Sequence, residues 1–308
     1  IKYSIAALEI SIFLMSTITI VEVLNNNGCF DFIQESLRTI NPKRFVWILA
    51  GITFILSANL DNVTTACMML AIMHVMVADE KTRMMFGAVI ILATNCGGAF
   101  TVIGDITSLT LWMNGLVSPT TYAQVLFLPC ITALTIVLLL VSRKLPRRLH
   151  LVHTAPPYRG DDTILTRKQR FLLLLVGIGG LWSIPTLHRI TLLPPFVGAL
   201  CILALLWMFN ELCNRSILHS DQMVRKRLPV ALQYATFQNI LYFIGLVMAL
   251  GAVTETGYLE DLFQWLTTHL DGNIYWIGVV MGLLSAVLNN VTMLLSLIHI
   301  CEPTRLQL

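Results

Sequence analysis

Two aspartates lie inside long apolar stretches of this sequence, and they are its most distinctive chemical feature. Asp61 interrupts the apolar run Phe45–Val77, and Asp105 lies in the polar, glycine-containing stretch Thr94–Ser108. An aspartate at the centre of a membrane helix costs about 2.5–3.5 kcal/mol on insertion scales. Each acid therefore needs a partner, a water-filled cavity or a function, although an aspartate can also hydrogen-bond to its own turn.

Neutral oxygen-bearing side chains gather around both aspartates. Carboxylate, amide and hydroxyl oxygens are the ligands that hard cations such as Na⁺ prefer, and broken helices add backbone carbonyls. The same side chains could instead cap broken helix ends. We treat Asp61 and Asp105 as candidate Na⁺ ligands, and the further candidates for an ion path are Asn62, Thr64, Thr65, Asn95, Thr107 and Ser108.

The first of these polar stretches occurs twice in the chain. Leu56–Thr65 returns as Leu284–Thr292, with Asn289 in place of Asp61, and the match extends upstream of both copies. A unit duplicated within a membrane chain is typical of secondary transporters. The pattern therefore predicts two structural repeats, each with a polar interruption at the same place.

The composition indicates a membrane protein. Of the 308 residues, 56% are hydrophobic and only 12% are charged, so the chain is expected to be all-α and polytopic. The net charge of +3 does not indicate a nucleic-acid partner, because the basic residues fall in loops between apolar spans. The seven cysteines are scattered without a CxxC pair, so they predict packing residues, not a disulfide framework or metal site.

The length of one apolar run predicts a helical hairpin. As a single helix, Phe45–Val77 would measure about 50 Å, which exceeds the roughly 30 Å of membrane hydrocarbon. A re-entrant hairpin with its tip at Ser57–Thr65 would fit. In the next span, the glycines and polar residues of Thr94–Ser108 predict unwound backbone, which membrane depth permits only against protein or a wet cavity.

Loop charges predict the orientation of the chain. Two basic loops flank a pair of spans, so they share one side, and the positive-inside rule assigns that side to the cytoplasm. A hairpin at Phe45–Val77 brings Lys43 and Arg44 to the same side, and the second copy then opens from the outside. The repeats are therefore expected to be inverted. The expected segments are the first transmembrane repeat (1–142, with an interfacial helix near 30–40), a cytoplasmic basic loop (143–170), a helix pair (171–210), a second cytoplasmic loop (211–228), the start of the second, truncated repeat (229–294) and a tail (295–308).

Five motifs together resemble the NhaD-type sodium/proton antiporters of the ion transporter superfamily: Ser57–Thr65, Ala93–Trp112, Leu193–Phe196, Asn239–Gly257 and Leu283–Val291. The resemblance implies that Asp61, Asn62, Asp105 and Ser108 line the ion path, and that the second hairpin contributes Ser285, Asn289 and Asn290. The chain departs from the family pattern at Asn289, where the family usually has Asp, and at Thr101-Val102, where it has Ser-Pro.

The resemblance implies exchange of Na⁺ or Li⁺ for H⁺ by a multi-pass protein of the bacterial inner membrane. It implies no cofactor beyond the transported ions, lipid and monovalent cations as partners, no enzymatic activity, and an oligomeric state left open, with a homodimer as one arrangement. A dicarboxylate or arsenite carrier of the same superfamily is the nearest alternative, disfavoured by breaks rich in acid and poor in Arg and Lys. An intramembrane aspartyl protease with Asp61 and Asp105 as its catalytic pair is a further, less favoured alternative, because it would need Gly where Val102 stands.

The two ends of the sequence carry a separate expectation. The chain begins at Ile1 within a span, which suggests truncation, and Leu295–Arg305 closely resembles the translation of a transposase adapter used in sequencing libraries. We therefore expect 295–308 to be a non-native tail.

Overall fold

The computed structural model describes residues 2–37, 41–145, 165–213 and 274–287, with scattered positions between 241 and 269. These residues form two compact units, Phe13–Thr236 and a second one made of Ile1–Ile12 and Phe237–Leu308. Several expectations lie outside the described residues: most of both basic loops, the first part of the second repeat, Asn289, Asn290 and the tail.

Every regular element among the described residues is an α-helix, in agreement with the expected all-α fold. The helices are α1 (Lys2–Asn26), α2 (Asp31–Ser36), α3 (Pro42–Ser57), α4 (Asn62–Met76), α5 (Glu80–Ala99), α6 (Ile106–Met113), α7 (Pro119–Lys144), α8 (Arg167–Thr191), α9 (Pro195–Cys213) and α14 (Ile274–Val287).

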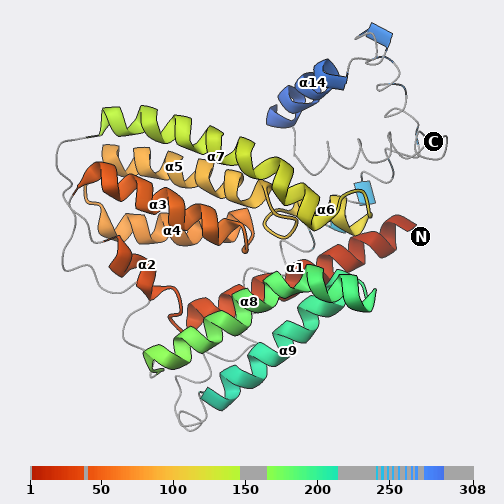
Figure 1. The fold of residues 1–308 in the computed structure, drawn as a ribbon, viewed down its shortest axis with the longest axis horizontal. Helices are drawn as coiled ribbons and strands as arrows, with labels where there is room; N and C mark the ends of the chain where they lie inside the picture. Colours follow the sequence, from red (N-terminus) through yellow and green to blue (C-terminus); the bar gives the residue numbers. More distant parts are fainter. Residues whose placement is uncertain are drawn as a thin grey trace. The chain divides into compact units, whose positions relative to one another are not determined.

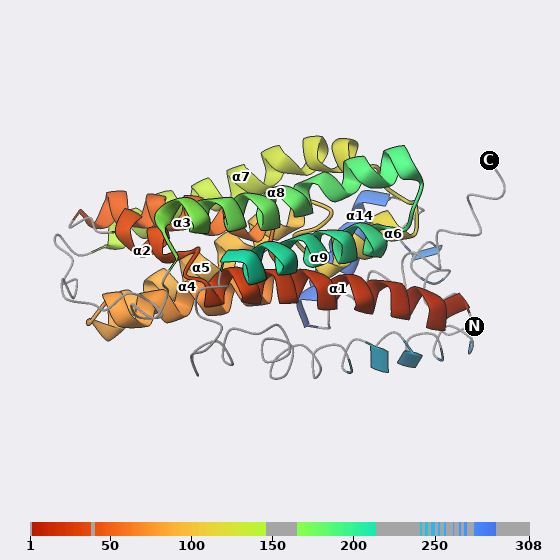
Figure 2. The same cartoon turned by 90° about the horizontal axis from the view of Figure 1, so that it is seen from below.

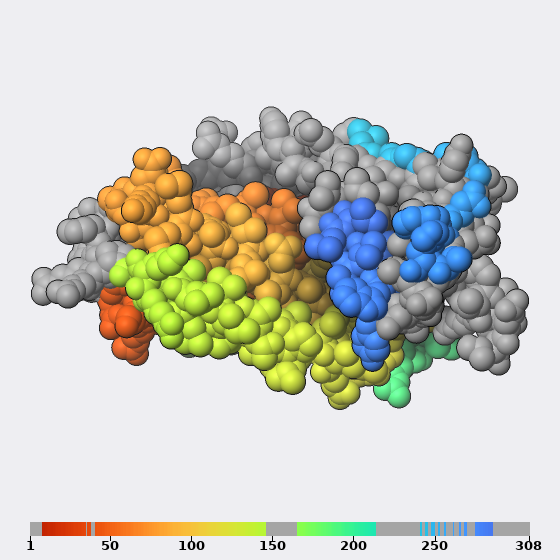
Figure 3. Space-filling view, turned by 90° about the horizontal axis from the view of Figure 1, so that it is seen from above, coloured from red at the N-terminus to blue at the C-terminus, as the bar shows by residue number. Residues whose placement is uncertain are grey.

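Four of the described helices are long and apolar enough to cross a membrane: Leu8–Asn26 within α1, and α7, α8 and α9. α7 is the most apolar of them, and it lies at the surface of the larger unit (yellow-green, Figure 3). Its side chains at Val125, Leu128 and Ile136 are each at least 59% exposed. Large apolar side chains on the outside of a helix suit contact with lipid, so the chain is a multi-pass membrane protein.

Within the larger unit, α5 packs against three helices. It contacts α3, α4 and α7, and α3 also contacts α4 and α7 (Figure 1). The rings of Phe45 on α3 and Phe86 on α5 are both fully buried, with their centroids 4.9 Å apart. This four-helix group holds both polar interruptions, so its packing determines how the two aspartates lie.

A second group in the same unit consists of α8, α9 and the part of α1 from Phe13 onward, which lie side by side in both ribbon views (Figures 1 and 2). Glycines permit the close packing: a Cβ at Gly180 would lie 2.6 Å from the Ile202 side chain, and one at Gly177 would lie 2.8 Å from Leu24. α8 therefore packs on α9 and on α1 through small residues, as membrane helices commonly do.

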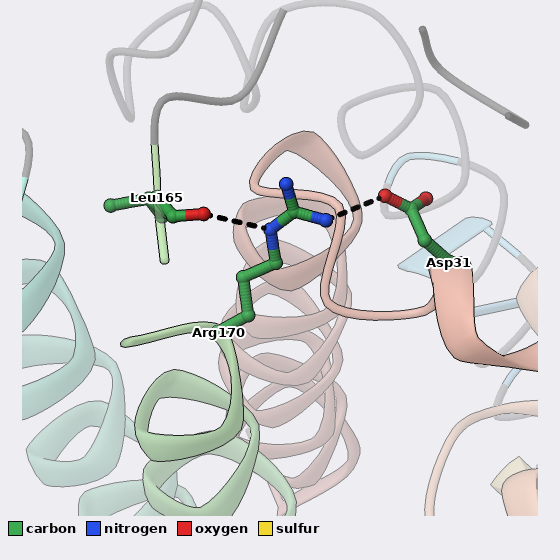
Figure 4. Close-up of polar contacts among 3 residues, drawn as sticks. All are labelled: Asp31, Leu165 and Arg170. Atoms are coloured by element: carbon green, nitrogen blue, oxygen red, sulfur yellow. Dashed lines mark hydrogen bonds and ion pairs between the residues drawn. The ribbon is translucent and has the colours of Figure 1, made fainter. Parts of the chain in front are cut away.

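Polar contacts fix one end of this second group. Nη1 of Arg170, at the start of α8, lies 3.0 Å from the Asp31 carboxylate of α2, while its Nε donates to the Leu165 carbonyl (Figure 4). Nearby in the sequence, the buried amide of Asn27 donates to Oδ1 of Asn210 on α9 at 2.7 Å. The first contact joins α2 to α8, and the second joins the turn after α1 to α9.

The long run Phe45–Val77 is two helices, not one. α3 ends at Ser57 and α4 begins at Asn62, so each measures about 22–24 Å. The two helices contact each other and form a hairpin through the turn at Ala58–Leu60. The sequence predicted this interruption from the length of the run and its polar residues, but the non-helical part, Ala58–Asp61, is shorter than the expected tip Ser57–Thr65.

The second interruption is shorter than the sequence predicted. The expectation was unwound backbone across Thr94–Ser108, but α5 remains helical through Ala99 and only Phe100–Asp105 is non-helical. Gly97 stays in the helix because its missing side chain allows close packing: a Cβ there would overlap the Phe54 carbonyl oxygen of α3. Gly97 therefore permits the close approach of α3 to α5 and does not terminate α5.

Candidate functional site

Both aspartates are the N-cap residues of helices. Asp61 precedes α4, and its Oδ1 accepts a hydrogen bond from the backbone N–H of Thr64 at 2.9 Å. Asp105 precedes α6 and accepts a hydrogen bond from the Thr107 hydroxyl. A carboxylate is favoured at a helix N-terminus because unpaired N–H groups and the helix dipole face it. Each acid is thus stabilised locally by the helix that it precedes.

The two interruptions touch each other through polar groups. The Thr101 hydroxyl donates to the Ala58 carbonyl at 2.7 Å and accepts from the N–H of Gly104 at 3.0 Å. The Ser57 hydroxyl donates to the Thr94 carbonyl of α5 at 2.6 Å. We call this meeting point of the 57–62 turn, the end of α5 and the 100–105 segment the crossing.

The Asn62 side chain lies at the centre of the crossing. With the amide turned so that Nδ2 points inward, this nitrogen lies 2.9 Å from the Gly104 carbonyl oxygen, 3.1 Å from Ser57 Oγ and 3.3 Å from the Thr94 carbonyl oxygen. The opposite orientation of the amide would set its oxygen against carbonyl oxygens, so the surrounding hydrogen bonds select the inward nitrogen. Asn62 therefore contacts the first helix hairpin, α5 and the second break at once.

Two glycines permit this close approach. A Cβ at Gly98 would overlap the Asn62 amide and lie 2.8 Å from the Gly104 carbonyl oxygen. A Cβ at Gly104 would lie 2.5 Å from the Ser57 carbonyl oxygen and 2.8 Å from the Cα of Gly98. The backbone atoms of the two breaks thus approach as closely as their heavy atoms allow.

Asp105 has further neighbours on α6 and α7. Ser108 is fully buried, and its hydroxyl donates to the Asp105 carbonyl at 2.9 Å. Tyr122 of α7 lies beside both Asp105 and Ser108. The sequence reasoning missed Tyr122, since nothing in the apolar pattern of α7 marks it.

Two buried side-chain oxygens near Asp61 lack a hydrogen-bond partner among the described residues. They are Oγ1 of Thr65, on a fully buried side chain, and Oδ1 of Asn59, on one that is 4% exposed. Asn59 is not free as a whole, because its Nδ2 donates to the Ile55 carbonyl at 2.7 Å. Buried oxygens without donors are costly, and a bound cation is one way to satisfy them. The sequence predicted Thr65 but not Asn59.

One predicted site residue of the larger unit does not contribute to the crossing, and three others lie in the other unit or outside the described residues. Asn95 is exposed on α5, and its amide donates to the Ile91 carbonyl of its own helix at 2.7 Å. Ser285 lies in α14 of the other unit, and Asn289 and Asn290 lie outside the described residues. The ion-path roles of these four residues remain predictions, as do those of the seven residues near the crossing.

The polar atoms at the crossing come from hydroxyls, an amide and backbone carbonyls. Among the described residues, no group of three or more His, Cys, Asp or Glu side chains could hold a metal. The oxygens that lie at the crossing belong to hydroxyls and backbone carbonyls, which are hard ligands, and they are hydrogen-bonded to one another and to Asn62. A fold of apolar helices with polar breaks is that of a membrane transport protein.

Sequence comparison gives the family. The family model described as "CitMHS: Citrate transporter" matches residues 3–305, so the chain belongs to this transporter family and not to an enzyme family. The chain is 30% identical to Sodium/proton antiporter 1 and to Sodium/proton antiporter 2 of Arabidopsis thaliana, over 92% of its own length. It is 26% identical over 94% of its length to the Na⁺/H⁺ antiporter NhaD of Vibrio parahaemolyticus. The resemblance to NhaD-type antiporters that the motifs predicted is confirmed.

The match covers nearly all of this chain but not all of its relatives. The chain spans 48% and 66% of the two Arabidopsis proteins and 73% of the Vibrio protein.

Proposed function

We propose that this protein exchanges Na⁺ or Li⁺ for H⁺ across a membrane, with Asp61 and Asp105 as the groups that bind either ion. The observation that carries the proposal is that the two helix N-termini bearing these acids meet at one hydrogen-bonded crossing. The names of the relatives, which are sodium/proton antiporters, support the same reaction.

Competition for the carboxylates would couple the two ions. A proton on Asp61 or Asp105 removes the negative charge that attracts Na⁺, and bound Na⁺ repels the proton, so the site carries one or the other. Hydroxyl and carbonyl oxygens at the crossing would complete the shell of Na⁺, for which Thr65 and Ser108 are candidates. Alternating access of this site to the two sides of the membrane would then turn competition into exchange.

Re-entrance of the α3–α4 hairpin and inverted repeats are part of the proposal. Each hairpin helix is shorter than the roughly 30 Å hydrocarbon core, which suits a segment that enters and leaves on one side. Contacts between distant helices support the predicted orientation. The ion pair between α2 and α8 and the hydrogen bond from the end of α1 to α9 join segments assigned to the cytoplasmic side, whereas Trp112 of α6 contacts His188 of α8 on the other side.

Carriage of an anion is the second candidate, because the family description names citrate. A citrate site would need positive groups or free helix N-termini to face the substrate carboxylates. At the crossing, both helix N-termini are already occupied by aspartates. This arrangement favours a cation over an anion. We also propose the bacterial inner membrane as the location, and we leave the oligomeric state open, with a homodimer as one arrangement.

Reconstituted vesicles test the proposal. With the purified protein and an imposed ΔpH, added NaCl should dissipate the gradient, and Asp105→Asn should abolish this effect because the neutral side chain cannot exchange a proton. Asp79→Asn is the matched control, since Asp79 is also an N-cap aspartate but belongs to the start of α5, away from the crossing. Exchange by Asp105→Asn at the parent rate would refute the ion-site assignment, and uptake of labelled citrate without Na⁺-dependent proton movement would favour the anion carrier.

A further inference from the structure

The inward nitrogen of Asn62 connects the neighbours of both acids. Asn62 directly follows Asp61, and the carbonyl that lies 2.9 Å from its Nδ2 belongs to Gly104, which directly precedes Asp105. We propose that Asn62 is a positioning residue: its N–H groups hold the two helix breaks together and so fix the two aspartate-bearing helix ends relative to each other. The consequence for transport rests on the proposed function, whereas the positioning itself does not.

The donor count of the amide fits this role. A primary amide has two N–H groups, which here reach the Gly104 carbonyl at 2.9 Å and Ser57 Oγ at 3.1 Å. Ser57 then passes its own hydroxyl hydrogen to the Thr94 carbonyl at 2.6 Å. The resulting chain of hydrogen bonds runs from the second break through the first break to α5. No neutral acceptor side chain at position 62 could replace the two donors.

The close packing around the amide leaves it little freedom to move. A Cβ at Gly98 would overlap the end of the Asn62 side chain, so the bare glycine backbone forms one wall of its site. The side chain of Ser57 forms another wall and is fully buried. A substitution that loses the donors cannot be rescued by a shift of the side chain.

This role differs from the one that the sequence suggested. From the sequence, Asn62 is expected among the residues that line the ion path, where its oxygen would coordinate the cation. The two roles make opposite predictions for Asn62→Asp. A cation ligand should tolerate a carboxylate or bind more tightly, whereas a donor to two acceptors loses both hydrogen bonds and gains repulsion from the Gly104 and Thr94 carbonyls.

Thermal unfolding of the purified protein in detergent measures the positioning without any transport. Asn62→Ala and Asn62→Asp should each lower the midpoint by about 5 °C, with the aspartate at least as harmful as the alanine. Asn114→Ala and Asn114→Asp are the matched controls, because the amide of Asn114, the residue that follows α6, donates to the Thr110 carbonyl of that helix at 2.8 Å. The controls should shift the midpoint by about 2 °C or less. A parent-like midpoint for Asn62→Asp would overturn the proposal.

The transport assay separates positioning from simple loss of folded protein. If Asn62 holds the two acids in register, Asn62→Ala should raise the Na⁺ concentration for half-maximal exchange about tenfold per amount of folded protein. A purely structural role would lower the maximal rate and leave that concentration unchanged, which would contradict the positioning role. An Asn62→Asp variant that exchanges Na⁺ better than Asn62→Ala would identify the residue as a ligand and overturn the proposal. If the parent itself shows no Na⁺-dependent exchange, the proposed function fails. The unfolding data alone then test whether Asn62 holds the two helix breaks together.

Discussion

Replacing Gly104 with alanine should open the crossing, because the added methyl group has no space. Its Cβ would lie 2.5 Å from the Ser57 carbonyl oxygen, 2.7 Å from Thr101 Oγ1 and 2.8 Å from the Cα of Gly98. Two of these three atoms belong to backbone, so no side-chain rotation can relieve the overlap. The 100–105 segment would have to move away from the 57–62 turn.

The expected cost follows from two contributions. Overpacking of a tight interior typically costs about 1–3 kcal/mol, and displacement of the Gly104 carbonyl would also weaken its hydrogen bond from Asn62, worth about 1 kcal/mol. Gly104→Ala should therefore destabilise the protein by about 2–4 kcal/mol. Gly51→Ala on α3 is the control, since nothing lies within 4 Å of a Cβ there. It should stabilise the helix by about 0.5–1 kcal/mol, because alanine restricts the unfolded chain more than glycine.

Chemical or thermal unfolding in detergent, followed by far-UV circular dichroism, measures both variants. The two should move the transition in opposite directions. A Gly104→Ala protein as stable as the parent would mean that the two breaks do not approach as described, and the arrangement of both aspartates would then be wrong.

Three further predictions concern single contacts. Thr65→Val should leave the ion-free protein equally stable or up to about 1 kcal/mol more stable in the same unfolding assay, because it removes a buried hydroxyl without a described partner; a loss above about 1 kcal/mol would show that the hydroxyl is satisfied. A double-mutant cycle of Asp31→Asn and Arg170→Gln should give a coupling free energy of about 0.5–1 kcal/mol that falls at high salt, since the Asp31 side chain is 21% exposed and that of Arg170 is 28% exposed. Zero coupling at low salt would contradict the ion pair. Burial raises the pKa of the Cys29 thiol, in the turn after α1, to about 12, so the thiolate is scarce at pH 8. N-ethylmaleimide should therefore label Cys29 far more slowly in the folded protein than in the denatured protein at that pH, and equal rates would refute its burial.

The sequence alone determined the class of protein and the places where its helices are interrupted. Apolar runs of membrane-spanning length report helices directly, because backbone hydrogen bonds must close within each span in lipid. The run Phe45–Val77 was too long for one crossing, which predicted the break that the structure has between Ser57 and Asn62. Asp61 and Asp105 stood out because charge at that depth is costly, and both are helix N-caps in the structure.

Only the tertiary structure decided how the interruptions are used. From the sequence alone, glycines indicate helix breaks, yet Gly97 and Gly98 remain within α5. Phe54 and Asn62 approach them from other segments, and this close approach requires residues without a side chain. Likewise, the sequence marks Asn62 as polar but cannot orient its amide, because the acceptors that select the inward nitrogen come from residues 5, 32 and 42 positions away.

The remaining tertiary contacts left no local trace in the sequence. Tyr122 lies in an apolar helix and reaches Asp105 only because α7 packs against α5. Arg170 and Asp31 stand 139 positions apart, and their pairing depends on the packing of α8 beside α1. Periodicity and composition describe each helix by itself, whereas the choice of partner depends on the shapes of two surfaces that the chain brings together only when it folds.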